Sequence, residues 1–346
     1  MSKVTLAVRY RPKVFSDVVE QDSTKVILQQ QLESGEFKNS YLFVGGAGTG
    51  KTTCARIFAN EINNGQGSPI ELDAASNSGV EDVRNIIQQA KSKSLDSEYK
   101  VFIIDECHSL SNTAWQAFLK LIEEPPAKSI FIFCTTNHEK IPKTILSRVQ
   151  RYDFKRISQN GITERLAYIL DEENITGYKV SNWLPAITYI AKLADGGMRD
   201  AITMMDKCLS YSQELTVENV TKALGIADYE TMINLTESIL HYGVKDTINI
   251  VEQIHSEGKD LKQFIKQYIN FVLDIKKWLI FKNFDFLNIP QTDMIETFLG
   301  NFTEAFYYDK ISDVLSTLIK LQSEIKYDSS PKYMIEVMLL KECEKD

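Results

Sequence analysis

A glycine-rich segment between an apolar run and a helical stretch constrains the fold of this chain more than any other feature. It reads Gly45, Gly46, Ala47, Gly48, Thr49, Gly50, Lys51 and Thr52, which fits the phosphate-loop pattern of two spaced glycines followed by Lys and Thr. The apolar run Tyr41–Val44 precedes it and a helix-like stretch from Thr53 follows it. In this setting, backbone N–H groups and a helix N-terminus surround a polyphosphate. We therefore expect a nucleotide site rather than an accidental glycine-rich turn.

Short apolar runs alternate with helical stretches over the first 154 residues. This alternation predicts a parallel sheet between helices, an α/β fold. The expected strands are Tyr41–Val44, Ile70–Leu72, Val101–Ile104, Ile130–Cys134 and Tyr152–Phe154. Ligands of such sheets bind at the carboxyl ends of the strands, so side chains there are candidate site residues.

Polar side chains follow two of these expected strands. Asp105 and Glu106 come directly after Val101–Ile104, and Thr136 follows Ile130–Cys134. In a phosphate-loop protein, Lys51 would contact the β- and γ-phosphates, while Thr52 and Asp105 would hold Mg²⁺. Glu106 would orient and deprotonate the water that attacks the γ-phosphate.

The rest of the chain reads as helical. Helices dominate from residue 155 to 224, and the pattern from 225 to 346 is wholly helical. One apolar stripe, formed by Phe264, Tyr268, Phe271, Ile275 and Leu279, has the spacing of a helix-bundle core. We therefore predict three domains, with boundaries near residues 154 and 224.

Composition excludes several classes of protein. The five cysteines and four histidines of the 346 residues lack metal-ligand spacing, so we expect neither zinc nor disulfides. No apolar run is long enough for a membrane helix and no signal-peptide core is seen, so a cytoplasmic protein without membrane partners is expected. The net charge of −8 does not favour general nucleic-acid binding.

Further motifs resemble those of one family of ATPases. They include Tyr10-Arg11-Pro12, Val18-Val19-x-Gln21, Asp73-Ala74-Ala75-Ser76, Asp105-Glu106-Cys107-His108, Glu123-Glu124-Pro125-Pro126, Thr135-Thr136, Ser147-Arg148 and Gly197-Met198-Arg199-Asp200-Ala201. Their order over residues 9–201 resembles AAA+ clamp-loader ATPases, most of all the gamma/tau family of bacterial DNA polymerase III and more distantly the small subunits of replication factor C. The resemblance implies an AAA+ module, then a helical lid (155–224) and an all-α oligomerisation collar (225–346).

This resemblance assigns roles to particular residues. Arg148 matches the family's arginine finger, which acts in trans on the ATP site of a neighbouring subunit. Arg199 matches the second sensor, which contacts the γ-phosphate from the lid, and Thr136 matches the first sensor. The segment that packs around adenine is matched by Tyr10, Arg11, Pro12, Val18 and Val19.

The resemblance also implies partners. These are other clamp-loader subunits in a ring, the sliding clamp, primer–template DNA and, as a further expectation, the DNA polymerase. DNA phosphates would meet two helix N-termini, through Ser76, Asn77 and Ser78 at one and Ser111 and Asn112 at the other. The implied place is the bacterial cytoplasm or a phage-infected cell.

The chain departs from the family pattern in four places. The family's zinc insert is replaced by the short connection 63–69, and its Ser-Arg-Cys is Ser147-Arg148-Val149. Its Val-Val-Gly-Gln is Val18-Val19-Glu20-Gln21, which is expected to alter a turn. The sequence ends soon after a segment that resembles the end of the collar, so the polymerase-binding tail of tau is expected to be absent.

Two other functions compete with clamp loading. One is another AAA+ DNA-processing motor, of the helicase-loading or branch-migration type; the all-helical C-terminal part argues against it. The other is a non-hydrolysing scaffold like the delta-prime subunit. The intact set of Lys51, Thr52, Asp105 and Glu106 argues against a scaffold.

Overall fold

The computed structural model describes residues 4–92, 96–175, 180–225, 229–302, 305–328 and 330–343. The chain divides into two compact units. The first contains residues 1–177 and 190–206, and the second contains residues 178–189 and 207–346. The three-domain division at residues 154 and 224 stays a prediction, and the two units are described separately below.

A five-stranded parallel sheet forms the centre of the first unit. The strands are β1 (Ser40–Gly45), β2 (Ile70–Asp73), β3 (Lys100–Asp105), β4 (Ser129–Thr135) and β5 (Gln150–Phe154). Their order in the sheet is β2-β3-β4-β1-β5, and every pair is parallel. All five predicted strands are therefore confirmed, and the α/β fold class with them. The register aligns Asp73 with Asp105 and Val44 with Thr135 at the carboxyl edge.

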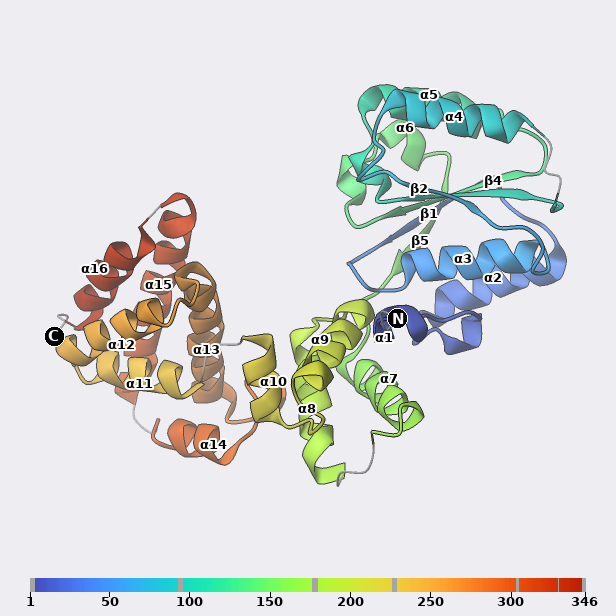
Figure 1. The fold of residues 1–346 in the computed structure, drawn as a ribbon. Helices are drawn as coiled ribbons and strands as arrows, with labels where there is room; N and C mark the ends of the chain where they lie inside the picture. Colours follow the sequence, from blue (N-terminus) through green and yellow to red (C-terminus); the bar gives the residue numbers. More distant parts are fainter. Residues whose placement is uncertain are drawn as a thin grey trace. The chain divides into compact units, whose positions relative to one another are not determined.

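Helices cover both faces of this sheet (Figure 1). Helices α2 (Asp22–Ser34) and α3 (Lys51–Ile62) lie on one face, while α4 (Val80–Lys91) and α5 (Asn112–Glu123) lie on the other. Alternate residues of each strand enter the two cores: Leu42 packs with the α4–α5 side and Phe43 with the α2–α3 side. Because β1, β3 and β4 are buried on both faces, these three strands read as continuous apolar runs. Shorter elements are α1 (Leu6–Arg9), η1 (Phe15–Asp17), η2 (Cys107–Ser109), η3 (His138–Lys140) and α6 (Lys143–Leu146).

Four helices follow the sheet, as the loss of strand patterns after residue 154 predicts. They are α7 (Gln159–Glu172), α8 (Val180–Leu193), α9 (Met198–Tyr211) and α10 (Val217–Leu224). Ser158 caps the first of them, because its hydroxyl accepts a hydrogen bond from the N–H of Gly161 at 3.0 Å. The boundary between the two compact units passes through α8 and α9.

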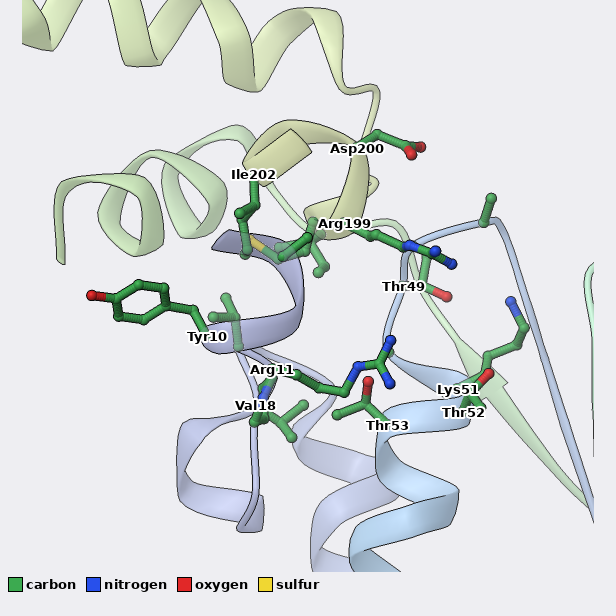
Figure 2. Close-up of a pocket in the computed structure, with 18 of the residues that line it drawn as sticks. Tyr10, Arg11, Val18, Thr49, Lys51, Thr52, Thr53, Arg199, Asp200 and Ile202 are labelled. Atoms are coloured by element: carbon green, nitrogen blue, oxygen red, sulfur yellow. The ribbon is translucent and has the colours of Figure 1, made fainter. Parts of the chain in front are cut away.

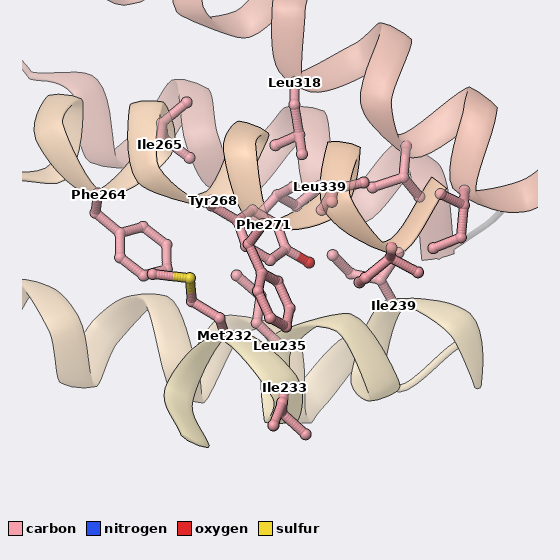
Figure 3. Close-up of a cluster of buried hydrophobic side chains, with 14 of the residues drawn as sticks. Met232, Ile233, Leu235, Ile239, Phe264, Ile265, Tyr268, Phe271, Leu318 and Leu339 are labelled. Carbon is pink, nitrogen blue, oxygen red and sulfur yellow. The ribbon is translucent and has the colours of Figure 1, made fainter. Parts of the chain in front are cut away.

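The C-terminal helices share one apolar core. They are α11 (Tyr229–Leu240), α12 (Val244–Ser256), α13 (Leu261–Phe281), α14 (Asp293–Gly300), α15 (Ala305–Glu324) and α16 (Pro331–Cys343), with η4 (Phe284–Phe286) and η5 (Ile325–Tyr327) between them. The predicted stripe on α13 faces this core: Phe264, Tyr268, Phe271 and Ile275 are buried, and Leu279 is partly buried (Figure 3). The Tyr268 hydroxyl pairs with that of Thr236 at 3.0 Å, so the one polar atom of the stripe is satisfied.

The cysteines behave as small apolar residues. All five are buried free thiols, and burial raises the pKa of Cys54 to about 12. Among the described residues, no cluster of three or more His, Cys, Asp and Glu side chains has metal-binding geometry. Within that same part of the chain, no helix is both long and apolar enough to cross a bilayer.

Candidate functional site

The glycine-rich loop takes backbone conformations that favour glycine. Gly48 and Gly50 have φ values of +69° and +100°, in the left-handed region. A Cβ at Gly45 would lie 2.4 Å from the carbonyl oxygen of Phe154 on the neighbouring strand. Within the loop, the Thr49 hydroxyl donates a hydrogen bond to Gly46 O at 2.9 Å. The predicted strand–loop–helix arrangement is therefore present, since the loop joins β1 directly to α3.

Lys51 is buried at the first position of α3 and its ammonium group lies inside the loop. Its Nζ donates to the carbonyl oxygens of Gly45 at 3.0 Å and Gly46 at 2.7 Å. Burial lowers the pKa of Lys51, and the negative charges of Glu106 and Asp105 oppose this shift. The ammonium group is thus held by two neutral acceptors and near two carboxylates, in a place where a polyphosphate would compensate its charge.

Thr52 and Asp105 meet across the end of the sheet. The Thr52 hydroxyl donates to Asp105 Oδ2 at 2.8 Å, which joins the start of α3 to the end of β3. Hydroxyl and carboxylate oxygens are the ligand types that Mg²⁺ prefers. The two residues expected to hold Mg²⁺ are therefore adjacent, with donor chemistry that fits the ion.

Glu106 lies beside Asp105 but points its carboxylate toward β4. It has a left-handed backbone (φ +45°), and its Oε2 accepts a hydrogen bond from the Thr136 hydroxyl at 3.0 Å. His108 Nδ1 lies 3.2 Å from the same oxygen. Thr136 and Glu106, predicted separately, therefore form one pair. Sequence reasoning treated His108 as a structural or surface residue. Its position three residues after Asp105 was the available signal that it lies near the site.

The start of α9 docks directly on the phosphate loop. The N–H of Met198 donates to Gly48 O at 3.0 Å, and a Cβ at Gly48 would lie 3.0 Å from the Cα of Gly197. Figure 2 shows Arg199 extending from this helix toward the loop beside Thr49 and Lys51. Within the described part of the chain, no ion pair of Arg199 with Asp200 is present. The side chain is thus available to a ligand of the loop.

A cavity of about 280 Å³ connects these groups. Its walls include the predicted residues Tyr10, Arg11, Pro12, Val18, Val19, Ala47, Gly48, Thr49, Gly50, Lys51, Thr52, Thr53, Asp105, Glu106 and Arg199. They also include residues that sequence reasoning missed, namely Ala7, Asp17, Ile157, Arg165, Met198, Asp200 and Ile202. The polar loop forms one end, and the apolar groups supply the kind of wall that a nucleobase prefers.

Tyr10 is fixed to the end of α7. Its hydroxyl donates to the Glu173 carboxylate, and Arg165 donates to Tyr10 O at 3.1 Å. Burial, together with Glu173, raises the pKa of Tyr10 to about 12, so the phenol stays protonated and keeps this bond at neutral pH. The segment expected around adenine is thereby tied to the helix that follows the sheet.

Glu20, at the position where the resembling family has glycine, lies in a left-handed turn. Its φ is +55° and that of Gln21 is +58°. The Glu20 carboxylate accepts hydrogen bonds from the N–H and hydroxyl of Ser158 at the start of α7. A carboxylate at a helix N-terminus is favourable. The Glu20 side chain therefore adds a contact to α7.

We expect Glu20→Ala to be less stable than Glu20→Gly by about 1 kcal/mol. Both variants lose the carboxylate, but alanine keeps the left-handed strain that glycine lacks. Urea unfolding of the two variants measures the difference. The reverse order of stability would show that the turn relaxes when the contact to Ser158 is removed.

Arg148 lies away from the cavity, after α6. It is not among the residues that line the nucleotide cavity, and its side chain is 40% exposed in an ion pair with Glu123 at 2.9 Å. This placement agrees with a role of Arg148 outside the cavity of its own chain.

The residues expected at DNA lie together on the surface. Ser76, Asn77 and Ser78 follow β2, and Ser111 and Asn112 begin α5; all five are exposed. The N–H of Ser111 donates to Ser78 O at 3.3 Å, which joins the two segments. The first turn of α4 carries Glu81 and Asp82, whereas that of α5 has no acidic residue. A phosphate is therefore favoured at α5 rather than α4.

Family models match consecutive parts of this chain. Residues 68–158 match the model described as DNA polymerase III, delta subunit, and residues 161–214 match the ATPase lid domain of the DNA polymerase III clamp loader subunit. Residues 215–346 match domain III of DNA polymerase III subunits gamma and tau. The tau subunit of Bacillus subtilis is 35% identical over 97% of this chain.

The chain is similar to DNA polymerase III gamma/tau subunits over almost its whole length. The gamma/tau subunit of Mycoplasma genitalium is 31% identical over 86% of the chain, and the gamma subunit of Buchnera aphidicola is 29% identical over 97% of it. The chain covers 62% of the Bacillus subunit, 53% of the Mycoplasma subunit and 95% of the Buchnera subunit. It thus spans little more than half the length of the first two relatives.

Solved structures show the fold of this chain independently. The Thermotoga maritima RuvB Holliday junction branch migration motor superposes with a TM-score of 0.53 at 19% identity, over 75% of this chain and 90% of that one. At this identity the likeness establishes the AAA+ fold alone. It does not favour the branch-migration alternative over the gamma/tau relationship.

Proposed function

We propose that this chain is a clamp-loader ATPase subunit. It would use ATP binding and DNA-stimulated hydrolysis to load a sliding polymerase clamp onto primer–template DNA. The observation that carries the proposal is the single cavity lined by both Lys51 of the loop and Arg199 of α9, in a chain similar to gamma/tau subunits. A lid residue that faces the phosphates can report whether ATP is bound, which a motor of this kind needs.

Each polar group of the cavity has a part in this proposal. Lys51 would exchange the carbonyls of Gly45 and Gly46 for the β- and γ-phosphates. Mg²⁺, held by Thr52 and Asp105, would supply charge neutralisation on the phosphates. Tyr10, Arg11, Pro12, Val18 and Val19 would enclose the adenine.

Glu106 is the proposed general base. Its carboxylate would orient the attacking water and accept its proton. In the structure this carboxylate is paired with Thr136 and His108, so it must turn from them or share them with the water. Thr136 is thus proposed to sense the γ-phosphate through the same hydroxyl that pairs with Glu106.

The proposed partners follow from the exposed groups. Arg148 would complete the site of a neighbouring subunit, which requires an oligomer. The N-terminus of α5, with Ser111 and Asn112, would meet DNA phosphates without reading bases. The sliding clamp, primer–template DNA and further clamp-loader subunits are the proposed partners, the DNA polymerase is a possible further one, and the bacterial or phage-infected cytoplasm is the proposed compartment.

ATP hydrolysis by the assembled complex tests this function. We expect the rate to rise severalfold when primer–template DNA and the cognate clamp are both added, because the neighbour's arginine is then brought to each site. The rise should weaken as salt is increased, since phosphate contacts release counterions. A rate that neither DNA nor clamp changes, in a complex shown to be assembled, would exclude clamp loading.

A further inference from the structure

The guanidinium of Arg148 is held in place by groups of its own subunit. Its Nη1 donates to Thr144 O at 2.8 Å and to the Ser147 hydroxyl at 3.1 Å. Its Nη2 lies 2.9 Å from Oε1 of Glu123. Glu123 is the last residue of α5, so this contact joins two helices rather than one turn.

These contacts leave part of the guanidinium available. An arginine has five N–H donors in a fixed plane, and both hydrogen bonds come from Nη1. Within the described part of the chain, the N–H groups of Nε and Nη2 have no hydrogen-bond partner; Nη2 makes only the ion-pair contact to Glu123, and the side chain is 40% exposed. Two donors on adjacent nitrogens suit bidentate recognition of a phosphate.

We propose that Glu123 is a positioning residue for Arg148. It holds the guanidinium so that the donors of Nε and Nη2 face the γ-phosphate of the neighbouring subunit. The inference rests on the proposed trans role of Arg148. An arginine side chain loses considerable rotamer freedom when it binds, and an ion pair that orients it beforehand reduces this loss at the moment of reaction.

Glu123 also has an effect that opposes this positioning role, and that effect is smaller. A carboxylate beside the guanidinium also offsets part of the positive charge that would act on the phosphates. Glu123 and Arg148 are 44% and 40% exposed, so water screens this offset. Orientation therefore dominates, and removal of Glu123 should slow the reaction rather than speed it.

The test is Glu123→Ala in the full chain within its assembled complex, with primer–template DNA and clamp present. We expect kcat for ATP hydrolysis to fall about 2- to 10-fold, while the KM for ATP stays the same. Glu123→Gln should restore most of the rate, because its amide oxygen can keep the contact with Nη2. Glu124→Ala is the matched control: it removes the same charge from the next residue, which lacks an ion pair within the described part of the chain, and should leave kcat unchanged.

Arg148→Ala separates this inference from the function on which it rests. If Arg148→Ala has full activity, the trans role itself is wrong. If Arg148→Ala is slow but Glu123→Ala matches Glu124→Ala, or hydrolyses faster than the parent protein, only the positioning role is overturned. The double variant should be no slower than Arg148→Ala, and a further loss would show that Glu123 acts by another route.

Discussion

Arg148→Ala should slow ATP hydrolysis by the assembled oligomer about 10³-fold or more, while ATP binding stays close to that of the parent protein. Arginine fingers stabilise charge on the transferring phosphoryl group, and their loss costs several powers of ten in rate. Arg148 does not line the cavity of its own chain, so we do not expect it to affect the affinity of that cavity for ATP. Steady-state hydrolysis and equilibrium binding of a fluorescent ATP analogue measure the two effects separately.

A mixing experiment sharpens this prediction. Arg148→Ala chains supply intact cavities, and Lys51→Ala chains supply intact arginines. In an oligomer that admits several copies, mixing the two inactive variants should therefore restore part of the activity. Failure of every mixture to exceed the two separate rates, in oligomers shown to contain both chains, would contradict action between subunits.

Lys51→Ala should weaken ATP binding about 100-fold or more. The ammonium group is buried and would be paired with the phosphates, and removal of one member of a buried charge pair has an effect of this size. The fold should persist, because the variant also removes a charge whose burial already lowers its pKa. Isothermal titration with ATP and Mg²⁺ gives the affinity, and thermal unfolding without nucleotide confirms that the chain is folded.

Lys140→Ala is a suitable control for this variant. Lys140 ends η3 on the exposed surface and carries the same charge. Its removal should leave ATP affinity unchanged. Equal losses in the two variants would mean that general electrostatic attraction, rather than the loop geometry, determines binding.

The centre of the sheet was predictable because β1, β3 and β4 are buried on both faces. Val101–Ile104 is an uninterrupted apolar run that ends at a carboxylate, and such a run has few other folds available to it. The phosphate loop was predictable for a related reason, since glycines at the positions of Gly48 and Gly50 meet a conformational need that few other residues can satisfy. Local sequence was sufficient in both cases.

The rest of the cavity could not be read from local sequence. Ile157, Met198 and Ile202 line it, yet they lie more than a hundred residues from the loop, Ile157 just before α7 and the other two on α9. Apolar residues of this kind are far more often core than ligand contacts. The pairing of Glu106 with Thr136 also depends on the adjacency of β3 and β4, which single residues do not reveal.

The substitution at Glu20 shows a different limit. A glutamate in place of a glycine indicated an altered turn. In the structure Glu20 lies in a left-handed turn, and its carboxylate contacts the N-terminus of α7, a partner 138 residues away in the sequence. A local conformational penalty can thus be offset by a distant contact, and only the fold shows which contact.

The contact between Gly48 and the start of α9 has a practical consequence for anyone who attaches a reporter to this protein. Only backbone atoms surround Gly48 at this contact. Gly197 is so near that a Cβ added at residue 48 would lie too close to its backbone. A dye or cross-linker at either glycine would hold the two segments apart. Its signal would then reflect the distortion that the label itself causes. A reporter of their movement therefore has to be attached outside this contact and outside the cavity, whose wall includes Ala47.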